Sequence, residues 1–295
     1  METTTFTFAA ADGLAIHTYR WSPPAGVDIV GCVQIAHGMG EHAGRYARLA
    51  EALTAAGWVV YANDHRAHGL TATGRHIGEG GLGDMGAGGW NGLVDDLARL
   101  NQLIADEQPG RPRVLLGHSM GSFAAQQYVL EHSSDIDALV LSGTTAVDLA
   151  AATFDPDGPA DLTALNVGFE PGRTSYDWLS RDEAEVDVYI ADPLCGFGID
   201  AAATRGMVAA APPLGDPETL AGIRSDLPIY VVAGSADPLN FELALLELLE
   251  QRYRDAGVAD ITTDYHQGAR HEVFNETNRD EITANLLAWL DRFAT

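Results

Sequence analysis

The stretch Val114–Gln126, VLLGHSMGSFAAQ, places Ser119 where an apolar, strand-like run turns into a helix-like one. Gly-x-Ser-x-Gly between a strand and a helix is the pattern of a nucleophile elbow, which raises the serine hydroxyl above the edge of a sheet. Gly117 and Gly121 lack the side chains that would collide across so tight a turn. The pattern therefore favours Ser119 as a nucleophile, with an ordinary turn as the alternative.

The segments around this stretch alternate between strand-like and helix-like patterns. Repeated strand–helix–strand order implies parallel pairing, with helices on both faces of the sheet. Asp12-Gly13 supplies the turn chemistry for an opening hairpin. The expected strands are 4–10, 14–23, the apolar run within 28–38, 57–62, 113–117, 136–143, 227–235 and 260–266, and the expected helices are 45–57, 89–107, 123–132, 240–257 and 281–293.

Residues 145–225 interrupt this alternation. Prolines break the segment at short intervals, yet it is rich in aromatic residues and too long for a linker. We expect a cap of short helices inserted between core residues 1–144 and 226–295, with a separately folding small domain as the alternative. The cap residues that are candidates for contacting a substrate are Phe154, Phe169, Trp178 and Phe197.

The charge balance is strongly acidic. The chain carries 42 acidic and 17 basic residues, a formal charge of −25, and all the basic residues are arginine. Such a surface repels nucleic-acid phosphates and anionic lipid headgroups, so neither is an expected partner. We interpret the acidity as a solvated surface, with a high-salt habitat as the alternative.

The first residues, METTTFTFAAADG, contain no basic leader and no long apolar run, which argues against a signal peptide. No stretch approaches the ~20 apolar residues that cross a bilayer, so we expect no membrane insertion and a cytoplasmic protein. Cys32 and Cys195 have neither metal-binding spacing nor the pattern of a disulfide framework.

A serine hydroxyl needs a general base, and in this architecture the order along the chain is serine, acid, histidine. Only His132, His266 and His271 follow Ser119. His132 precedes any acid at a later strand end, and His266 ends a predicted strand, where a structural role is expected. His271 lies in the loop before the last predicted helix and is therefore the candidate base.

The acid should also follow a strand end between these two residues. Asp237, in YVVAGSADPLN, follows an apolar run and precedes Pro238, which suits the start of a new element. Asp226 precedes a predicted strand and Asp264 lies inside one, so both are expected to be surface charges. Asp237 would orient the imidazole and stabilise the imidazolium.

A third requirement is a pair of donors for the oxyanion of the tetrahedral intermediate. The stretch QIAHGMGEH ends a predicted strand at His37 and continues into Gly38-Met39-Gly40. The flexible glycine Gly38 would let the Met39 amide converge with the amide of Met120. Two such donors contribute about 3 kcal/mol each to transition-state stabilisation. Taken alone, this stretch is equally compatible with a plain turn.

Six motifs occur in order and together cover nearly the whole chain: HGMGEHAGRY, YANDHRAHG, LLGHSMGS, ADPLCGFG, GSADPL and HEVFNE. They resemble the monoacylglycerol lipase and lysophospholipase-like branch (serine aminopeptidase S33 type) of the α/β-hydrolases. The resemblance implies the α/β-hydrolase fold, an eight-stranded sheet with a cap after the sixth strand. It places Ser119, Asp237 and His271 at the triad positions, and Met39 and Met120 at the oxyanion hole.

The chain departs from the family pattern at two positions. Ala67 stands where DHRGHG is usual, and Ser122 stands where a second glycine usually follows the elbow. Neither position belongs to the triad. The cap matches the family only around SYDWLSRDEAEVDVYIADPLCGFG, so the resemblance implies the chemistry more directly than a preference for monoacylglycerol.

We therefore expect a serine hydrolase that cleaves carboxylic esters through an acyl-enzyme and needs neither a cofactor nor a metal. The favoured substrates are monoacylglycerol-like or medium-chain monoesters with an apolar acyl chain. A thioesterase, amidase or perhydrolase could use the same triad. A small-molecule receptor without turnover is the alternative from another class. The sequence leaves the oligomeric state open.

Two further motifs have ordinary explanations. Gly-x-Gly-x-x-Gly occurs twice, at Gly78-Gly80-Gly83 and at Gly81-Gly83-Gly86, but the preceding predicted strand ends well upstream. A dinucleotide site needs the glycines directly between a strand and a helix, so a surface loop is expected. Asp64, His65 and His68 are the residue types of a metal site, and the expected role is structural.

Overall fold

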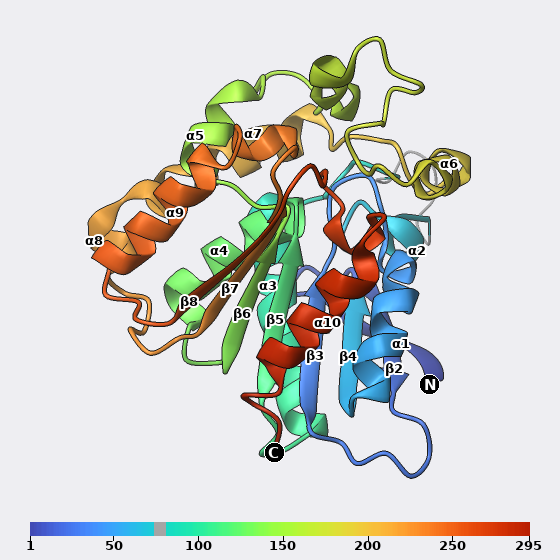
Figure 1. Ribbon diagram of the computed structural model, residues 1–295, viewed down its shortest axis with the longest axis vertical. Coiled ribbons are helices and arrows are strands. Elements are labelled where there is room, and N and C mark those ends of the chain that lie inside the picture. The colour runs from blue at the N-terminus through green and yellow to red at the C-terminus, as the bar shows by residue number, and fades with distance from the viewer. Residues whose placement is uncertain (74–80) are drawn as a thin grey trace.

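The computed structural model describes residues 1–73 and 81–295, which form one eight-stranded sheet flanked by helices (Figure 1). The order across the sheet is β1-β2-β4-β3-β5-β6-β7-β8. This confirms the predicted eight-stranded α/β architecture. The strands are β1 (Glu2–Ala9), β2 (Ala15–Ser22), β3 (Gly31–Ala36), β4 (Trp58–Asn63), β5 (Arg113–His118), β6 (Ala138–Ser142), β7 (Ile229–Gly234) and β8 (Ile261–His266).

The sheet is mostly parallel. β1 and β2 form the predicted antiparallel hairpin, and β2 also pairs antiparallel with β4. All other neighbouring strands are parallel. Gly13 turns the hairpin with φ 84°, a conformation that glycine adopts without steric cost. The parallel pairing brings the carboxyl ends of β3 to β8 to one edge, where the loops carrying the candidate residues begin.

Helices cover both faces of the sheet because the strands are apolar on both sides. Within β5, Leu115 joins a core with α3, α4 and α9, whereas Val114 and Leu116 join a second core with α1 and α10. The helices are α1 (Ala47–Ala55), α2 (Gly69–Thr73), α3 (Gly89–Glu107), α4 (Met120–His132), α5 (Val147–Ala150), α6 (Glu183–Ala191), α7 (Ala201–Ala210), α8 (Pro217–Leu220), α9 (Ala244–Asp255) and α10 (Arg279–Leu290).

The chain between β6 and β7, residues 143–228, is helical or irregular and is called here the β6–β7 segment. Its helices α5, α6 and α7 lie over the end of the sheet at which the parallel strands finish (Figure 1). The predicted cap boundaries, 145 and 225, fall inside this segment and stay a prediction. The segment also contains the short 3₁₀ helices η2 (Ala151–Thr153), η3 (Leu162–Phe169) and η4 (Pro212–Gly215), while η1 (Ala43–Tyr46), η5 (Pro238–Asn240) and η6 (Val273–Asn275) lie elsewhere.

One helix begins later than predicted. The expected helix 240–257 starts at Ala244, because Phe241, Glu242 and Leu243 all have positive φ. The Asn240 side chain accepts a hydrogen bond from the Leu243 amide (2.9 Å) and donates one to the carbonyl of Gly234 (2.8 Å). These bonds hold the residues before the helix in a separate turn. Apolar periodicity does not reveal such a turn, because the apolar residues of the turn continue the spacing of the helix that follows.

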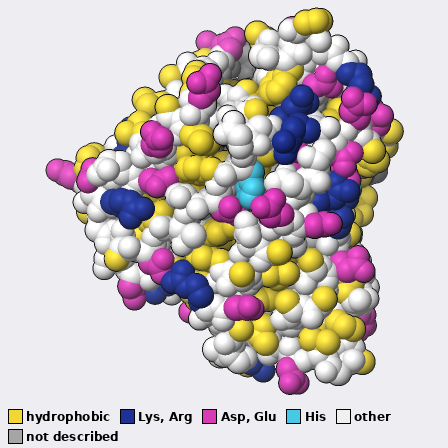
Figure 2. Space-filling view, viewed as in Figure 1, with side chains coloured by type: hydrophobic (Ala, Val, Ile, Leu, Met, Phe, Trp, Pro, Cys, Tyr) yellow, Lys and Arg dark blue, Asp and Glu magenta, His cyan; other side chains and the backbone are white. Residues whose placement is uncertain are grey.

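The acidic side chains are interspersed with other side chains on one face of the molecule (Figure 2). On the face shown in Figure 2 they alternate with apolar and uncharged areas instead of gathering in one patch. This distribution matches the interpretation of the negative charge as a solvated surface. In residues 1–73 and 81–295, no helix is both long and apolar enough to cross a bilayer.

The two glycine motifs fall in different places. Gly78 and Gly80 lie outside the described residues, so the first match has no structural counterpart here. The second match, Gly81 to Gly86, lies in turns that precede α3, as expected for a loop. The amide of Gly83 donates to the carbonyl of Ala67, which attaches this loop to the turn after β4.

Candidate active site

Ser119 sits in a strained turn between β5 and α4. Its backbone has φ 52° and ψ −124°, a region that residues with a side chain rarely adopt. The Ser119 amide donates to the carbonyl of Ser142 (2.9 Å), which ties the turn to the end of β6. The surrounding fold therefore imposes the conformation that an elbow requires.

The flanking glycines permit this turn for the steric reason inferred from the sequence. A Cβ atom on Gly117 would lie 2.6 Å from the carbonyl oxygen of Gly121. A Cβ atom on Gly121 would overlap the carbonyl group of Ala36, at the end of β3. Both contacts are with backbone, which cannot move aside. Every residue other than glycine is therefore excluded at these two positions without a shift of the sheet.

His271 and Asp237 form a buried pair at the same edge of the sheet. The Nδ1 atom of His271 lies 2.8 Å from Oδ2 of Asp237, and both residues are almost completely buried. The second carboxylate oxygen of Asp237 accepts the amide of Leu239 (3.0 Å), because Asp237 caps η5. Burial opposes the charged imidazole, but the charge and hydrogen bond of Asp237 outweigh it and raise the pKa of His271.

The His271 ring is enclosed by two aromatic rings and a glycine. The rings of His118 and Trp178 each lie 4.8 Å from it, centroid to centroid. A Cβ atom on Gly143 would come within 2.9 Å of both His118 and His271. Because His118 precedes Ser119 directly, these contacts bring the serine turn and the histidine loop together. Burial and the nearby His271 lower the pKa of His118 to about 4, so this ring is neutral at pH 7.

The loop after β3 lies against the serine turn. A Cβ atom on Gly38 would lie 3.1 Å from the Cβ of Ser119. Among the residues that the structure describes, the amides of Met39 and Met120 donate to no protein acceptor. The Gly38 amide is occupied, since it donates to Oε1 of Glu41 (2.6 Å). The two methionine amides therefore have no acceptor among the described residues, and their role as oxyanion donors stays a prediction.

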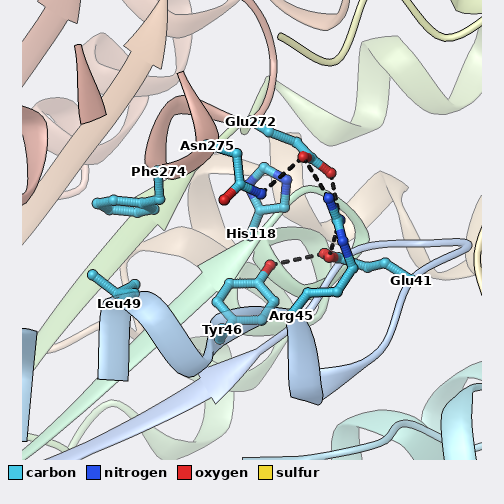
Figure 3. Close-up of a pocket in the computed structure, with 8 residues that line it drawn as sticks. All are labelled: Glu41, Arg45, Tyr46, Leu49, His118, Glu272, Phe274 and Asn275. Atoms are coloured by element: carbon cyan, nitrogen blue, oxygen red, sulfur yellow. Dashed lines mark hydrogen bonds and ion pairs between the residues drawn. The ribbon is translucent and has the colours of Figure 1, made fainter. Parts of the chain in front are cut away.

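A buried ionic network, which we call the Arg45 network, consists of Glu41, Arg45 and Glu272 (Figure 3). Arg45 contacts Oε2 of Glu41 at 2.6 Å and both carboxylate oxygens of Glu272 at 2.6 and 2.8 Å. Burial raises the carboxyl pKa values, but the Arg45 charge outweighs this and lowers the pKa of both Glu41 and Glu272. The network lines a small cavity of about 20 Å³, together with Tyr46, Leu49, His118, Phe274 and Asn275 (Figure 3).

Sequence reasoning missed most of this network. Glu41, Arg45 and Glu272 are not among the candidate site residues that the sequence suggests. The signal available was that Glu41 and Arg45 lie in HGMGEHAGRY and that Glu272 follows His271 in HEVFNE. Nothing in the spacing of these motifs indicates that they meet.

The four aromatic candidates of the predicted cap occupy different places. Trp178 packs against His271, and its carbonyl accepts the His271 amide (3.3 Å). Phe169 lines an open cavity of about 750 Å³ beside the loop after β7. Asp237 and Phe241 also line this cavity. Phe154 packs on the core, and the Phe197 ring lies 5.1 Å from the ring of His68. No common substrate surface follows from these positions.

The turn after β4 is held by structural contacts. The Asp64 carboxylate accepts the amides of Ala43 (2.8 Å) and Leu70 (2.7 Å). The Nε2 atom of His37 accepts the amide of His65 (3.0 Å). Burial lowers the pKa of His68 to about 4. These contacts agree with the structural role expected for Asp64, His65 and His68.

The structure brings together another set of potential ligands that the sequence did not suggest. In the described part of the chain, the ligand atoms of His42, Asp192 and Cys195 lie within 4.8 Å of one another. Asp192 is already engaged, because its carboxylate accepts His42 Nε2 (2.9 Å) and the amide of Leu194 (2.8 Å). The group therefore has a sufficient structural explanation as a link between the β3 loop and the β6–β7 segment.

The two departures from the family pattern have visible consequences. Ala67 has φ 75° and is fully buried, so the usual glycine has been replaced where the backbone favours glycine. The Ser122 hydroxyl donates to the carbonyl of Ser119 (2.6 Å) and lies 2.9 Å from the hydroxyl of Thr144. Ser122 therefore adds a side-chain support to the serine turn.

Comparison with known proteins places this geometry in context. The family described as serine aminopeptidase, S33 matches residues 28–278. The chain is 31% identical to the monoacylglycerol lipase of Mycolicibacterium smegmatis over 290 residues, covering 96% of this chain and 95% of that one. It is 28% identical to the monoglyceride lipase of Homo sapiens, covering 90% and 82%. It superposes on a thermostable carboxyl esterase from Bacillus coagulans with a TM-score of 0.87, 25% identity and 99% coverage of both chains.

Proposed function

The chain belongs to the serine aminopeptidase S33 family of α/β-hydrolases, and we propose that it hydrolyses carboxylic esters with Ser119, His271 and Asp237 as its catalytic triad. The observation that carries the residue assignment is the buried contact between His271 Nδ1 and Asp237 Oδ2 (2.8 Å). This contact lies at the sheet edge where Ser119 is held in a strained elbow. The three residue types and their places are those that a hydroxyl nucleophile requires.

The hydrogen bond to Asp237 defines the role of each imidazole nitrogen. Nδ1 of His271 donates its proton to the carboxylate, which leaves the lone pair of Nε2 free to act as a general base. When Nε2 takes the proton of the Ser119 hydroxyl, the imidazolium that forms faces a buried negative charge. The raised pKa of His271 expresses this stabilisation.

The reaction then proceeds in two halves. The Ser119 oxygen attacks the acyl carbonyl, and the amides of Met39 and Met120 bind the developing oxyanion, contributing about 3 kcal/mol each. His271 returns the proton to the leaving alcohol, which breaks the ester bond and leaves an acyl-serine. Water, deprotonated by the same imidazole, hydrolyses the acyl-enzyme and restores Ser119.

Lipid-like monoesters are the proposed substrates. The relatives from M. smegmatis and H. sapiens are a monoacylglycerol lipase and a monoglyceride lipase, which supports a glycerol monoester with an apolar acyl chain. We further propose that residues 145–225 form the cap over the site. This proposal is supported by the place of the β6–β7 segment at the carboxyl edge of the sheet (Figure 1).

Three single variants test the triad. Ser119→Ala and His271→Ala should lower kcat by at least about 10⁴-fold, and Asp237→Asn by about 10⁴-fold through loss of the correct tautomer. A fluorophosphonate probe should label Ser119 in the wild-type protein and should not label Ser119→Ala. Asp264→Asn is the matched control, because Asp264 accepts hydrogen bonds from Tyr230 in β7 and Asn285 in α10. Full activity of Ser119→Ala would overturn the proposal.

A substrate panel tests the reaction class. Monoacylglycerols and p-nitrophenyl esters of increasing chain length should be hydrolysed faster than matched thioesters and amides. Faster turnover of a thioester or an amide would move the protein to those classes. A burst of nitrophenol without steady turnover would indicate a receptor instead of an enzyme.

A further inference from the structure

We infer that the Arg45 network is a positioning device that fixes the oxyanion loop and the histidine loop relative to each other and places net negative charge near the histidine. The inference rests on the triad proposed above. Figure 3 shows the three charged side chains converging, with Arg45 between the two carboxylates. Arg45 touches neither the nucleophile nor the proposed oxyanion donors, so it acts through other residues.

One end of the network holds the loop after β3. Oε1 of Glu41 accepts the amide of Gly38 at 2.6 Å and the hydroxyl of Tyr46 at 2.8 Å. Gly38 precedes Met39, whose amide is a proposed oxyanion donor. The bond therefore occupies the Gly38 amide and fixes the peptide unit that directly precedes the one carrying the proposed donor.

The other end holds the loop after β8. Glu272 follows His271 directly, and both of its carboxylate oxygens bond Arg45 in a bidentate pair. Asn275, in η6, donates to the same carboxylate at 2.9 Å. A bidentate guanidinium–carboxylate pair defines an orientation as well as a distance. The backbone of Glu272, and with it that of His271, is thus tied to the side chain of Arg45.

Burial makes the network costly as a source of stability alone. The side chains of Arg45, Glu41 and Glu272 are 9%, 4% and 6% exposed. Removing three charges from water costs about as much as their attraction returns, and apolar replacements of buried ion pairs are often equally stable. What an ion network supplies and apolar packing does not is a fixed geometry between polar loops. The two loops joined here are those that carry Met39 and His271.

The network also leaves one uncompensated negative charge near His271. After burial and Asp237, the carboxylates of Glu272 and Glu41 are the next groups that raise the pKa of His271. Among the other groups facing this ring, His118 is neutral at pH 7 and Trp178 is uncharged. Arg45 is the one cation of the network and is shared between the two carboxylates. The network therefore favours the imidazolium that forms during proton transfer.

Two variants separate the effect of the network's charge on His271 from its effect on the geometry of the two loops. Glu272→Gln keeps a hydrogen-bonding partner for Arg45 but removes a charge, so the pKa of His271 should fall. The acid limb of kcat/KM should then move to lower pH, with activity at pH 5.5 relative to pH 8 about twofold higher than in the wild type. A purely structural role of Glu272 would leave this ratio unchanged, and an unchanged ratio would overturn the electrostatic part of the inference.

Arg45→Met removes the link but leaves two buried carboxylates unpaired, which can prevent folding. The triple variant Glu41→Gln, Arg45→Met, Glu272→Gln leaves no unpaired charge and keeps the test valid. We expect kcat to fall about 10- to 100-fold, with KM changed less than about threefold and with a parallel loss in the rate of fluorophosphonate labelling. The single variant Arg45→Lys, in an otherwise wild-type chain, should keep part of the kcat that the triple variant loses.

The control is Arg252→Met, which breaks a bidentate pair with Asp148 between α9 and α5. It should lower the unfolding temperature and leave kcat unchanged. If the triple variant folds and keeps the wild-type kcat and pH profile, the positioning role is wrong. A wild-type protein that a fluorophosphonate does not label at Ser119 would instead refute the proposed triad, whatever the network variants do.

Discussion

Two turns at the carboxyl edge of the sheet each contain a non-glycine residue with positive φ, but different kinds of contact stabilise them. The turn after β5 contains Ser119 at φ 52°, and the turn after β4 contains Ala67 at φ 75°. Ala67 is fully buried and Ser119 is half-buried, and both have a side chain where the backbone favours glycine. They differ in what holds them.

The turn after β5 is held by close backbone contact. Gly117 and Gly121 leave no space for even a methyl group, and the side-chain hydrogen bond to the Ser119 carbonyl comes from the uncharged Ser122. The turn after β4 is held by polar side chains instead. Arg66, 1% exposed, bonds Asp96 through Nε (2.9 Å) and Nη2 (3.1 Å), and it also reaches Asp12.

This difference distinguishes a reactive turn from a scaffold. In the β4 turn, the Asp64 carboxylate and the Arg66 guanidinium are bound to structural partners. Backbone packing positions the β5 turn without using the Ser119 hydroxyl. Backbone strain at Ser119 therefore holds a residue with a reactive hydroxyl. Backbone strain at Ala67 holds a residue whose side chain has no reactive group.

The largest effect should come from filling the β5 turn. Gly121→Ala places a methyl group on the Ala36 carbonyl, so we expect more than about 3 kcal/mol of destabilisation and loss of activity. Thermal unfolding and fluorophosphonate labelling measure the two consequences. Gly81→Ala, which meets open space, is the control. A stable, fully labelled Gly121→Ala would show that the turn is not held by backbone contact.

Removing the main partner of Arg66 should have the next largest effect, and on stability alone. Asp96→Ala leaves a buried guanidinium with Asp12 as its remaining carboxylate, for an expected cost of about 3 kcal/mol. The kcat value of the folded variant should equal that of the wild type. Denaturant titration against Asp95→Ala, the exposed neighbour, measures the cost. A selective fall in kcat would mean that the β4 turn participates in catalysis.

Both turns should weaken together when the pH falls. Burial lowers the pKa of His118 and of His68 to about 4, below that of the unfolded chain near 6.5. The unfolded chain therefore takes up protons first, and this stability is complete above pH 6.5 and lost as the pH falls toward 4. Between pH 7 and 5.5 the loss should be about 1 kcal/mol for each histidine.

Urea titrations at the two pH values measure this loss. Replacing His68 with asparagine should reduce it by the contribution of one histidine. Equal stability of the wild type at pH 7 and 5.5 would contradict the neutral, buried state of both rings.

The smallest effect should come from restoring glycine at the β4 turn. Ala67→Gly relieves about 1 kcal/mol of backbone strain but loses a buried methyl group and increases the entropy of the unfolded chain. These contributions act in opposite directions, so the free energy of unfolding should change by less than about 1 kcal/mol, and kcat/KM should be unchanged. Calorimetry and steady-state assays test this. A several-fold change in kcat/KM would show that strain at Ala67 is used after all.

Local patterns in the sequence determined the architecture. The periodic apolar spacing of 89–107 predicted α3 with its observed bounds, and the eight strands lie where apolar runs were expected. The order of Ser119, Asp237 and His271 selected residues that lie at one edge, because parallel strands bring their carboxyl ends together. Periodicity and chain order suffice here because both depend on neighbouring residues.

The tertiary structure alone decided the contacts that hold the loops. Arg45 and Glu272 are 227 positions apart, and their pairing depends on two loops meeting over the sheet. The overlap between Gly121 and Ala36 and the late start of α9 at Ala244 also depend on residues distant in the chain or on local hydrogen bonds. A steric clash or an ion pair depends on the distance in space between two residues. A single sequence gives the type of each residue but not that distance.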